Sequence, residues 1–406
     1  MNQTFETQCC ITGGGPAGLM LGYLLARAGV EVAVLEKHAD FLRDFRGDTI
    51  HPSTMEVMYE LGLLDEFLKL PHQRVPTLAA QFGDEKLTVA DFSHLNVHAP
   101  FIAMMPQWDF LSFLAEHAKT YPSFRLLMQA EVTDLIFQGE KVAGVKAITP
   151  EGEIDVRAKL TIGADGRTSQ VRSTAKLPVE DFGAPMDALW FSISRLKLDT
   201  DQTQGRFDAG RIFIMLNRGN YWQCAFVIAK GKNEQVRNDG LAKFRDTLRS
   251  LLPVDPERAN EIVSWDQVKL LKVEVNRLSR WWRPGLLCIG DAAHAMSPVG
   301  GVGVNLAVQD AVAAANILAT NLKNNTVTDS HLDAVQKRRT WPTSVIQQLQ
   351  IVIQNRLISS ALSEKKAFRA PLAFRLIIKT PLLNRLPGYI IGLGVRPELP
   401  SRALFP

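Results

Sequence analysis

Two glycine-rich turns, far apart in the chain, constrain the fold more than any other feature. The first, GGGPAG at residues 13–18, follows an apolar run and precedes leucines at helical spacing. The second, GDAAHAMSPVGGVGV at residues 290–304, also follows an apolar run and precedes an alanine-rich helical pattern. Each turn therefore predicts a strand that ends where a helix begins. Because one pyrophosphate needs only one glycine cradle, the pair indicates that opposite ends of one long ligand are bound.

The residues around the first turn predict a β–α–β unit. Residues 8–12 and 30–36 have the pattern of strands, and 16–28 that of a helix ending at Gly29. The right-handed crossover rule makes the two strands parallel neighbours. Amides of the turn and the positive end of the helix suit a pyrophosphate, and Glu36 can accept hydrogen bonds from ribose hydroxyls. The unit predicts an ADP-containing dinucleotide without separating NAD from FAD. The residues assigned to it are Gly13, Gly15, Pro16, Ala17, Gly18, Glu36 and Lys37.

The second turn precedes a helix that we expect to begin near Asn305. With the pyrophosphate at the first helix, this second helix end faces a different electron-rich group. An isoalloxazine ring fits, because its N1–C2=O edge becomes negative on reduction. We expect the Gly303 and Val304 amides at that edge and Asp291 at a ribityl hydroxyl. His294 is either a flavin neighbour or a histidine satisfied inside the loop. The residues assigned here are Gly290, Asp291, Pro298, Gly301, Gly303, Val304 and Asn305.

Composition excludes several other classes of protein. A net charge of +4, spread along the chain, is too mild for a nucleic-acid partner. The four cysteines form no CxxC pair, which favours a cytoplasmic location. The eight histidines are isolated, so no metal site is expected. The N-terminus has no signal-peptide pattern, and no uninterrupted apolar run reaches the ~18 residues of a spanning helix.

A third motif, GADGRTSQVR at residues 163–172, completes a set that resembles the FAD-dependent aromatic hydroxylases of the para-hydroxybenzoate hydroxylase type. These are class A flavoprotein monooxygenases and include the hydroxylases of ubiquinone biosynthesis. The resemblance extends from residue 8 to about residue 320. It implies that Asp165 supports flavin and pyridine-nucleotide binding, that Arg46 lies near FAD, and that Gln107 opens a helix beside the ribityl and pyrophosphate groups. Each residue also has a purely structural alternative. Asp165 would belong to an ordinary DG turn, Arg46 would pair with Asp44 or Asp48, and Gln107 would only begin a helix.

The resemblance also implies an α/β fold. We expect a Rossmann-like FAD-binding domain of the glutathione-reductase type, formed discontinuously by residues 1–75, 100–180 and 276–340. Residues 76–99 and 181–275 are expected to form an inserted, mainly antiparallel β-sheet domain that binds substrate. Its aromatic-rich strands lie at 187–194, 211–216 and 221–228. Their aromatic residues, which line a flat pocket or form ordinary sheet core, are Trp190, Phe191, Phe213, Tyr221 and Trp222.

The remaining residues, 341–406, are expected to form C-terminal helices. Prolines interrupt this region, and its part at 370–399 mixes apolar residues with arginine and lysine. Such a composition can lie on an anionic membrane. We favour helices packed over the substrate domain, because the prolines prevent a long amphipathic face.

The implied reaction is aromatic hydroxylation. NADH or NADPH reduces FAD, the reduced flavin adds O2 to form a C4a-hydroperoxide, and one oxygen atom passes to a phenol-like or polyketide-like small molecule. No catalytic side chain or base is assigned, and Pro298 and His294 are the flavin-proximal candidates. The alternatives are a FAD-dependent reductase or dehydrogenase, an epoxidase of a lipophilic substrate, and a flavin-bearing binding protein. Halogenation is disfavoured, because the Trp281–Trp282 pair does not fit the WxWxIP pattern of flavin halogenases.

Overall fold

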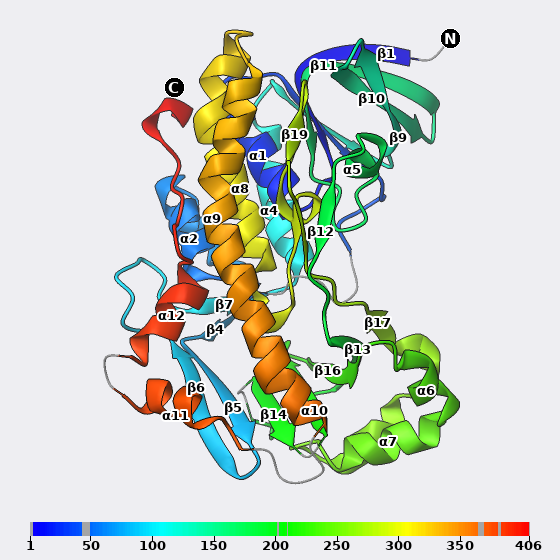
Figure 1. Ribbon diagram of the computed structural model, residues 1–406, viewed down its shortest axis with the longest axis vertical. Coiled ribbons are helices and arrows are strands. Elements are labelled where there is room, and N and C mark those ends of the chain that lie inside the picture. Colours follow the sequence, from blue (N-terminus) through cyan, green and yellow to red (C-terminus); the bar gives the residue numbers. More distant parts are fainter. Residues whose placement is uncertain are drawn as a thin grey trace.

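The computed structural model describes residues 3–42, 49–200, 203–208, 210–363, 369–380 and 383–405. Two large β-sheets lie toward opposite ends of the molecule (Figure 1). Helix α8 (Gly303–Lys323) lies beside the first sheet, and helix α9 (Asp329–Ile353) extends from it toward the second. This arrangement confirms the predicted α/β fold with an inserted sheet and C-terminal helices.

The first sheet has a parallel core, as the Rossmann-like prediction requires. Every residue of its strand β2 is buried, which is typical of a parallel strand covered on both faces. Helix α1 (Pro16–Arg27) connects β1 to β2 and begins with Pro16, whose missing N–H costs nothing in a first turn. The strands in spatial order are β19 (Trp282–Arg283), β20 (Leu286–Cys288), β11 (Gly152–Gly163), β1 (Gln3–Thr12), β2 (Val32–Glu36) and β8 (Phe124–Met128). In addition, β10 (Lys141–Thr149) pairs antiparallel with β11, and β9 (Glu131–Gln138) pairs antiparallel with β10.

The second sheet is antiparallel except for one parallel pair, β14 with β5. One of its faces packs against helix α7 (Leu241–Arg249), whose Phe244 and Leu248 join Phe191, Phe213 and Trp222 in a buried core. Side chains alternate along a strand, so Trp190, next to Phe191, points to the opposite face. The strands in spatial order are β17 (Lys269–Leu271), β13 (Met186–Ser194), β16 (Tyr221–Ala229), β15 (Arg211–Asn217), β14 (Gln204–Asp208), β5 (Thr77–Phe82) and β6 (Glu85–Asp91).

Shorter elements connect and cover the two sheets. Two small sheets contain β3 (Thr49–Ile50), β7 (Ile102–Met104) and β4 (Gln73–Val75), and β12 (Val179–Asp181), β18 (Asn276–Leu278) and β21 (His294–Ala295). A π-helical turn, Gln354–Ile358, extends α9. The other helices are α2 (Pro52–Glu60), α3 (Leu64–Phe67), α4 (Gln107–Lys119), α5 (Gln170–Thr174), α6 (Asn233–Asn238), α10 (Ser359–Ser363), α11 (Leu372–Lys379) and α12 (Arg385–Gly392).

One helical stretch in the described part of the chain, Val299–Lys323, is long and apolar enough to cross a membrane. Its most apolar window is 83% buried inside the protein. The stretch contains α8, which packs in the main core with α1, so it is a core helix of this fold.

Candidate active site

A cavity of about 1040 Å³ connects the two glycine turns with the second sheet. This volume reaches the upper end of the roughly 300–1,000 Å³ found for ligand pockets. Most of the predicted ligand residues line it, although they come from four separate parts of the chain. They are Gly13, Gly15, Pro16, Ala17, Glu36, Lys37, Gln107, Asp165, Asp291, Pro298, Gly301, Gly303 and Val304.

Four predicted residues are not among the described residues that line this cavity. They are Gly18, Gly290, His294 and Asn305. Arg46, together with the neighbouring Asp44 and Asp48, lies outside the described residues.

The two turns meet because glycine lets their backbones approach closely. Gly290 has a φ of +58°, and a Cβ there would lie 3.0 Å from the Ala17 Cβ and 3.4 Å from the Ala307 Cβ. Ala17 belongs to α1 and Ala307 to α8, so Gly290 lies where these two helices come together. In the first turn, a Cβ on Gly18 would lie 1.9 Å from the Gly13 carbonyl oxygen. Gly18 and Gly290 therefore serve packing between backbone segments.

Other glycines leave backbone open to the cavity. A Cβ on Gly15, Gly166 or Gly303 would meet no atom within 4 Å, and all three residues line the cavity. Gly15 immediately precedes α1 and Gly303 is the first residue of α8, so both lie at positive helix ends. The described residues therefore fit FAD, with room for a phosphate group at one turn and a flavin edge at the other.

The Glu36 carboxylate lies in the cavity wall at the end of β2. Its Oε2 accepts a hydrogen bond from the Gly14 N–H at 2.9 Å, and its Oε1 accepts one from the His38 N–H at 3.0 Å. These two bonds hold the carboxylate beside the first turn. A carboxylate oxygen can accept more than one hydrogen bond, which is the property that binding of ribose hydroxyls requires.

The DG motif joins the cavity at the end of β11. Asp165 Oδ1 accepts a hydrogen bond from the Ser169 hydroxyl at 2.5 Å, and Oδ2 accepts one from the Val171 N–H at 3.1 Å. Burial raises the pKa of this carboxyl against those stabilising bonds. Nearby, Arg167 pairs with Asp291 across 3.4 Å, which joins the DG motif to the second turn. Asp165 therefore holds the start of α5 and also lines the cavity.

Asn305 contacts the protein itself. Its Oδ1 accepts hydrogen bonds from the His51 N–H at 3.0 Å and from the Thr54 hydroxyl at 2.7 Å, so it fixes the start of α2. Helix α8 begins at Gly303, slightly earlier than expected from the sequence. Pro298 and Gly301 lie just before it, at the cavity surface.

The sequence did not predict a role for three glutamines of α9 and the π-helical turn that extends it. Gln350 Nε2 donates to the Ser297 and Val299 carbonyls at 3.0 and 2.9 Å, and its Oε1 accepts from the Ser297 N–H at 3.2 Å. Gln354 donates to the Ser297 hydroxyl, and Gln347 donates to the Asn276 and Ala295 carbonyls. Glutamines at helical spacing in a largely apolar stretch were the available signal. Together they hold the middle of the second turn, at Ala295, Ser297 and Val299.

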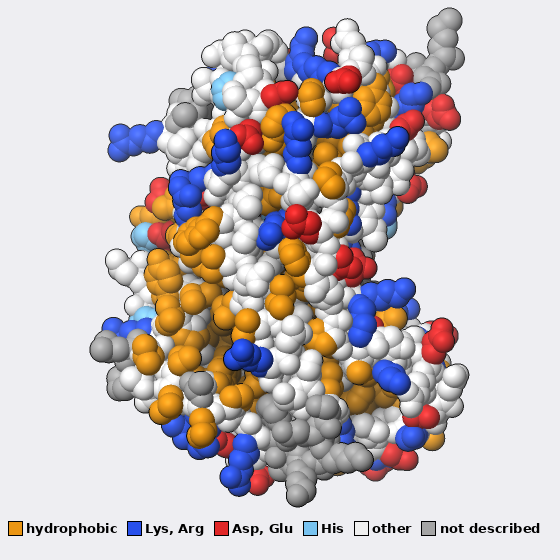
Figure 2. Space-filling view, in the orientation of Figure 1, with side chains coloured by type: hydrophobic (Ala, Val, Ile, Leu, Met, Phe, Trp, Pro, Cys, Tyr) orange, Lys and Arg blue, Asp and Glu red, His pale blue; other side chains and the backbone are white. Residues whose placement is uncertain are grey.

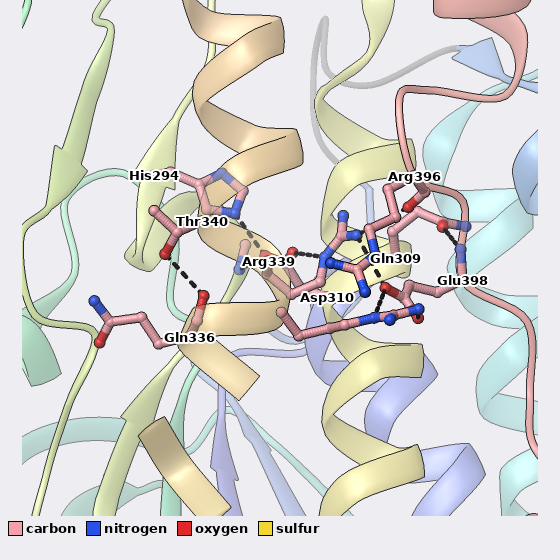
Figure 3. Close-up of polar contacts among 10 residues, drawn as sticks. His294, Gln309, Asp310, Gln336, Arg339, Thr340, Arg396 and Glu398 are labelled. Carbon is pink, nitrogen blue, oxygen red and sulfur yellow. Dashed lines mark hydrogen bonds and ion pairs between the residues drawn. The ribbon is translucent and has the colours of Figure 1, made fainter. Parts of the chain in front are cut away.

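His294 belongs to a buried ionic cluster behind the second turn (Figure 3). Its Nε2 lies 2.6 Å from Asp310 Oδ2, which also accepts the Gly290 N–H at 3.0 Å. Asp310 Oδ1 accepts from Arg339 Nε at 2.9 Å, and Glu398 lies 3.5 Å from Arg339 Nη1. All four side chains are buried. His294 thus contacts the ionic cluster through Nε2 and is not among the described residues of the cavity wall, while its Nδ1 is buried without a hydrogen-bond partner among the described residues. Asp310 supports the turn through Gly290.

The half of the cavity away from the turns is apolar. The face of the second sheet that is opposite α7, here called its outward face, contributes Trp190 to the cavity. Phe191, Phe213 and Trp222 belong to the core on the other face. The described residues that line this half include no aspartate, glutamate or histidine. Arg356 is the one charged side chain among the described lining residues of this half. Its apolar wall includes Leu78, Ala80, Phe82, Met186, Ala188, Trp190, Phe207, Ile212, Ile214, Leu216, Ala225 and Val227 from the sheet, and Leu349, Val352, Ile353, Leu357, Phe374, Ile377, Leu386 and Ile390 from the helices.

The C-terminal helices α11 and α12 cover this apolar half. Phe374 and Ile377 of α11 and Ile390 of α12 line the cavity. Other apolar side chains of this region are exposed, and Figure 2 shows such side chains gathered over these helices. They include Leu372, Leu376, Leu383 and Tyr389, and Leu386 is both exposed and part of the cavity wall.

Comparison with known proteins agrees with this site. Residues 6–349 match the family described as FAD binding domain. The 6-methylpretetramide 4-monooxygenase of Streptomyces rimosus is 30% identical over 402 residues, which cover 97% of this chain and 95% of that protein. A crystal structure of the p-nitrophenol 4-monooxygenase PnpA of Pseudomonas putida superposes with a TM-score of 0.77 at 21% identity, covering 97% of this chain and 100% of the other.

A halogenase shares the same fold. The myxobacterial chondrochloren halogenase CndH superposes with a TM-score of 0.75 at 18% identity, covering 98% of this chain and 99% of the other. At that identity the likeness concerns the fold alone. The family match and the full-length relative together show that the chain belongs to the FAD binding domain family and is an FAD-dependent aromatic monooxygenase that uses NAD(P)H, as its sequence motifs predicted.

Proposed function

We propose that the chain hydroxylates an extended, lipophilic aromatic molecule, such as a multi-ring polyketide phenol, in the apolar half of the cavity. One observation carries this proposal: the cavity runs unbroken from the Gly13 turn to the outward face of the second sheet. The name of the Streptomyces rimosus relative, 6-methylpretetramide 4-monooxygenase, supports a polyketide-like substrate. A cavity of about 1040 Å³ leaves room for such a molecule beside a cofactor.

The proposed site for FAD uses both turns. We assign the pyrophosphate to the backbone at Gly15 and the start of α1, and the adenosine ribose to Glu36. The flavin edge is assigned to the Gly303 and Val304 amides, where the positive end of α8 stabilises negative charge. The other residues proposed to contact FAD are Gly13, Pro16, Ala17, Lys37, Gln107, Asp165, Asp291, Pro298 and Gly301, all of which line the cavity.

The domain division is likewise part of this proposal. The second sheet takes its strands from residues 77–91 and 186–271, within the segments 76–99 and 181–275 that we assign to substrate binding. Residues 1–75, 100–180 and 276–340 are assigned to FAD binding, and 341–406 to the C-terminal helices. Helix α9 crosses the boundary at residue 340, because it extends from Asp329 to Ile353. Its C-terminal part contacts both regions: Gln350 bonds to Ser297 of the FAD-binding segment, and the neighbouring Leu349 lines the substrate half.

When bound, FAD carries electrons from NAD(P)H to O2 and delivers one oxygen atom to the aromatic ring. The chain itself provides a dry and flat pocket. The sheet wall near Trp190 and the helices α11 and α12 enclose the substrate in apolar surface, which excludes water. Because the described wall offers no acid or histidine, we assign no base to the substrate half.

We further propose a cytoplasmic location and a structural role for the C-terminal helices. All four cysteines are buried and free, which suits a reducing compartment. Helices α11 and α12 contribute cavity residues, and this supports their role as a wall over the substrate instead of a membrane anchor.

An oxygen-labelling experiment tests the proposed function. FAD-loaded protein is mixed with NADPH or NADH, 18O2 and either a multi-ring phenol or a single-ring phenol, and products are analysed by mass spectrometry. We expect one labelled oxygen atom in the product, with faster turnover of the multi-ring compound. Oxidation of NAD(P)H without label in the organic product contradicts hydroxylation and supports a reductase. Faster turnover of the single-ring compound contradicts the proposed substrate class.

A further inference from the structure

The charged residues that line the cavity are distributed unevenly. Among the described lining residues, almost every charged or histidine side chain belongs to the FAD half, close to the turns or to β2 and β9. These are Glu36, Lys37, His38, Glu131, Asp165, Arg167 and Asp291. In the apolar half, the described lining residues include a single charged side chain, Arg356.

Arg356 has no protein partner within the described chain. It appears in no hydrogen bond or ion pair with a described residue, and its sequence neighbours Ile353 and Leu357 also line the cavity. Some other arginines are paired, such as Arg258 with Asp199 and Arg338 with Glu398. A guanidinium carries five N–H donors and always remains charged. Arg356 is exposed to solvent and also lines the cavity, so these donors can bind an anionic oxygen group of a molecule held there.

Arg356 lies at the solvent-facing edge of the cavity, because it is exposed and also lines the cavity wall. It lies in the π-helical turn Gln354–Ile358, and such turns frequently occur at functional sites. Gln350, six residues earlier, contacts Ser297 and Val299 within the second turn. At 1.5 Å per residue, six residues correspond to roughly 9 Å along the helix. The Arg356 backbone therefore lies further along the helix than the contact that Gln350 makes with the second turn.

We propose that Arg356 binds an anionic oxygen group of the substrate, a carboxylate, enolate or phenolate, at the end distant from the carbon that is hydroxylated. This inference rests on the proposed function and narrows it to acidic multi-ring aromatics. The guanidinium fixes which ring of a long substrate faces the flavin, because one charged contact at the far end sets the position of the whole molecule. Arg356 thus determines both substrate preference and the position of hydroxylation.

A pair of matched probes tests this role. We measure the binding of 1-hydroxy-2-naphthoic acid and of its methyl ester to the FAD-loaded protein by the change in flavin absorbance. The wild type is expected to bind the acid more tightly. In Arg356→Gln, we expect the dissociation constant of the acid to rise by about tenfold or more, because a charged hydrogen bond is lost, while that of the ester changes less than about twofold. Arg356→Lys is expected to retain part of the preference.

Controls separate this inference from the function on which it rests. Arg385→Gln changes an exposed arginine of α12 that is not among the described lining residues, and it should leave both dissociation constants unchanged. FAD content and thermal stability should be the same in all variants. Equal binding of acid and ester by the wild type, or an equal change for both probes in Arg356→Gln, overturns the role of Arg356. Failure of the wild type to incorporate labelled oxygen into any aromatic compound instead overturns the proposed function.

Discussion

Replacing Asp310 with asparagine is expected to destabilise the protein strongly. The fully buried Asp310 carboxylate accepts hydrogen bonds from the Gly290 N–H and from Arg339 Nε, and it contacts His294 Nε2. Asparagine keeps the shape of the aspartate side chain but removes its negative charge. The buried Arg339 then keeps only its longer ion pair with Glu398, at 3.5 Å, among the described residues. Removing one partner of a buried ion pair typically costs about 3–5 kcal/mol in the free energy of unfolding. We expect a loss in that range.

The stabilisation by Asp310 depends on pH in a defined direction. Burial raises the pKa of this carboxyl, but His294 and Arg339 outweigh burial and hold the pKa below its usual value. A carboxyl whose pKa is lower in the folded state stabilises the fold above the unfolded-state pKa of about 3.9. That contribution is lost as pH falls through the lower, folded-state pKa.

Urea unfolding of the FAD-free protein at pH 7, followed by tryptophan fluorescence, measures the effect. Asp239→Asn is a matched control, because Asp239 forms an exposed pair with Lys243 at 2.9 Å. Such surface pairs contribute less than about 1 kcal/mol. A loss in Asp310→Asn below about 1 kcal/mol, or equal to that of the control, would refute the assigned role of the cluster.

Three further predictions concern the turns and the thiols. A Cβ on Gly15 would meet no atom within 4 Å, so Gly15→Ala should weaken FAD binding in a fluorescence titration without lowering the melting temperature. A Cβ on Gly18 would lie 1.9 Å from a carbonyl oxygen, so Gly18→Ala should lower both the affinity for FAD and the melting temperature. Glu36→Gln should raise the dissociation constant for FAD by about tenfold, because a charged acceptor is lost, and an unchanged value in the same titration would contradict the ribose assignment. Burial raises the pKa of Cys10 to about 12, so a thiol reagent should leave Cys10 unmodified until urea unfolds the protein, as peptide mass spectrometry can check.

Local patterns explain what could be predicted from the sequence. The strand–turn–helix signals at Gly13 and Gly290 depend on neighbouring residues, and the structure shows both turns beside one cavity. The family resemblance then indicated the flavin and the inserted sheet. Glu36 followed from its spacing after the first turn.

Long-range contacts explain what could not be predicted. Asn305 accepts a hydrogen bond from His51 across 254 positions of sequence, and His294 contacts an aspartate of the following helix, so neither partner was evident from local pattern. Gln350 and Arg356 acquire their roles only because α9 passes the second turn and then continues along the second sheet. Helices α6 and α7 were not predicted, because the aromatic-rich strand patterns were the strongest signal in residues 181–275.

A crystal structure of the protein with FAD bound tests the central claim most directly, because it shows where both ends of the cofactor lie. We predict the pyrophosphate beside the Gly15 backbone and the flavin ring edge beside the Gly303 and Val304 amides. A cofactor bound at one turn only, with its flavin ring away from the start of α8, would contradict the account.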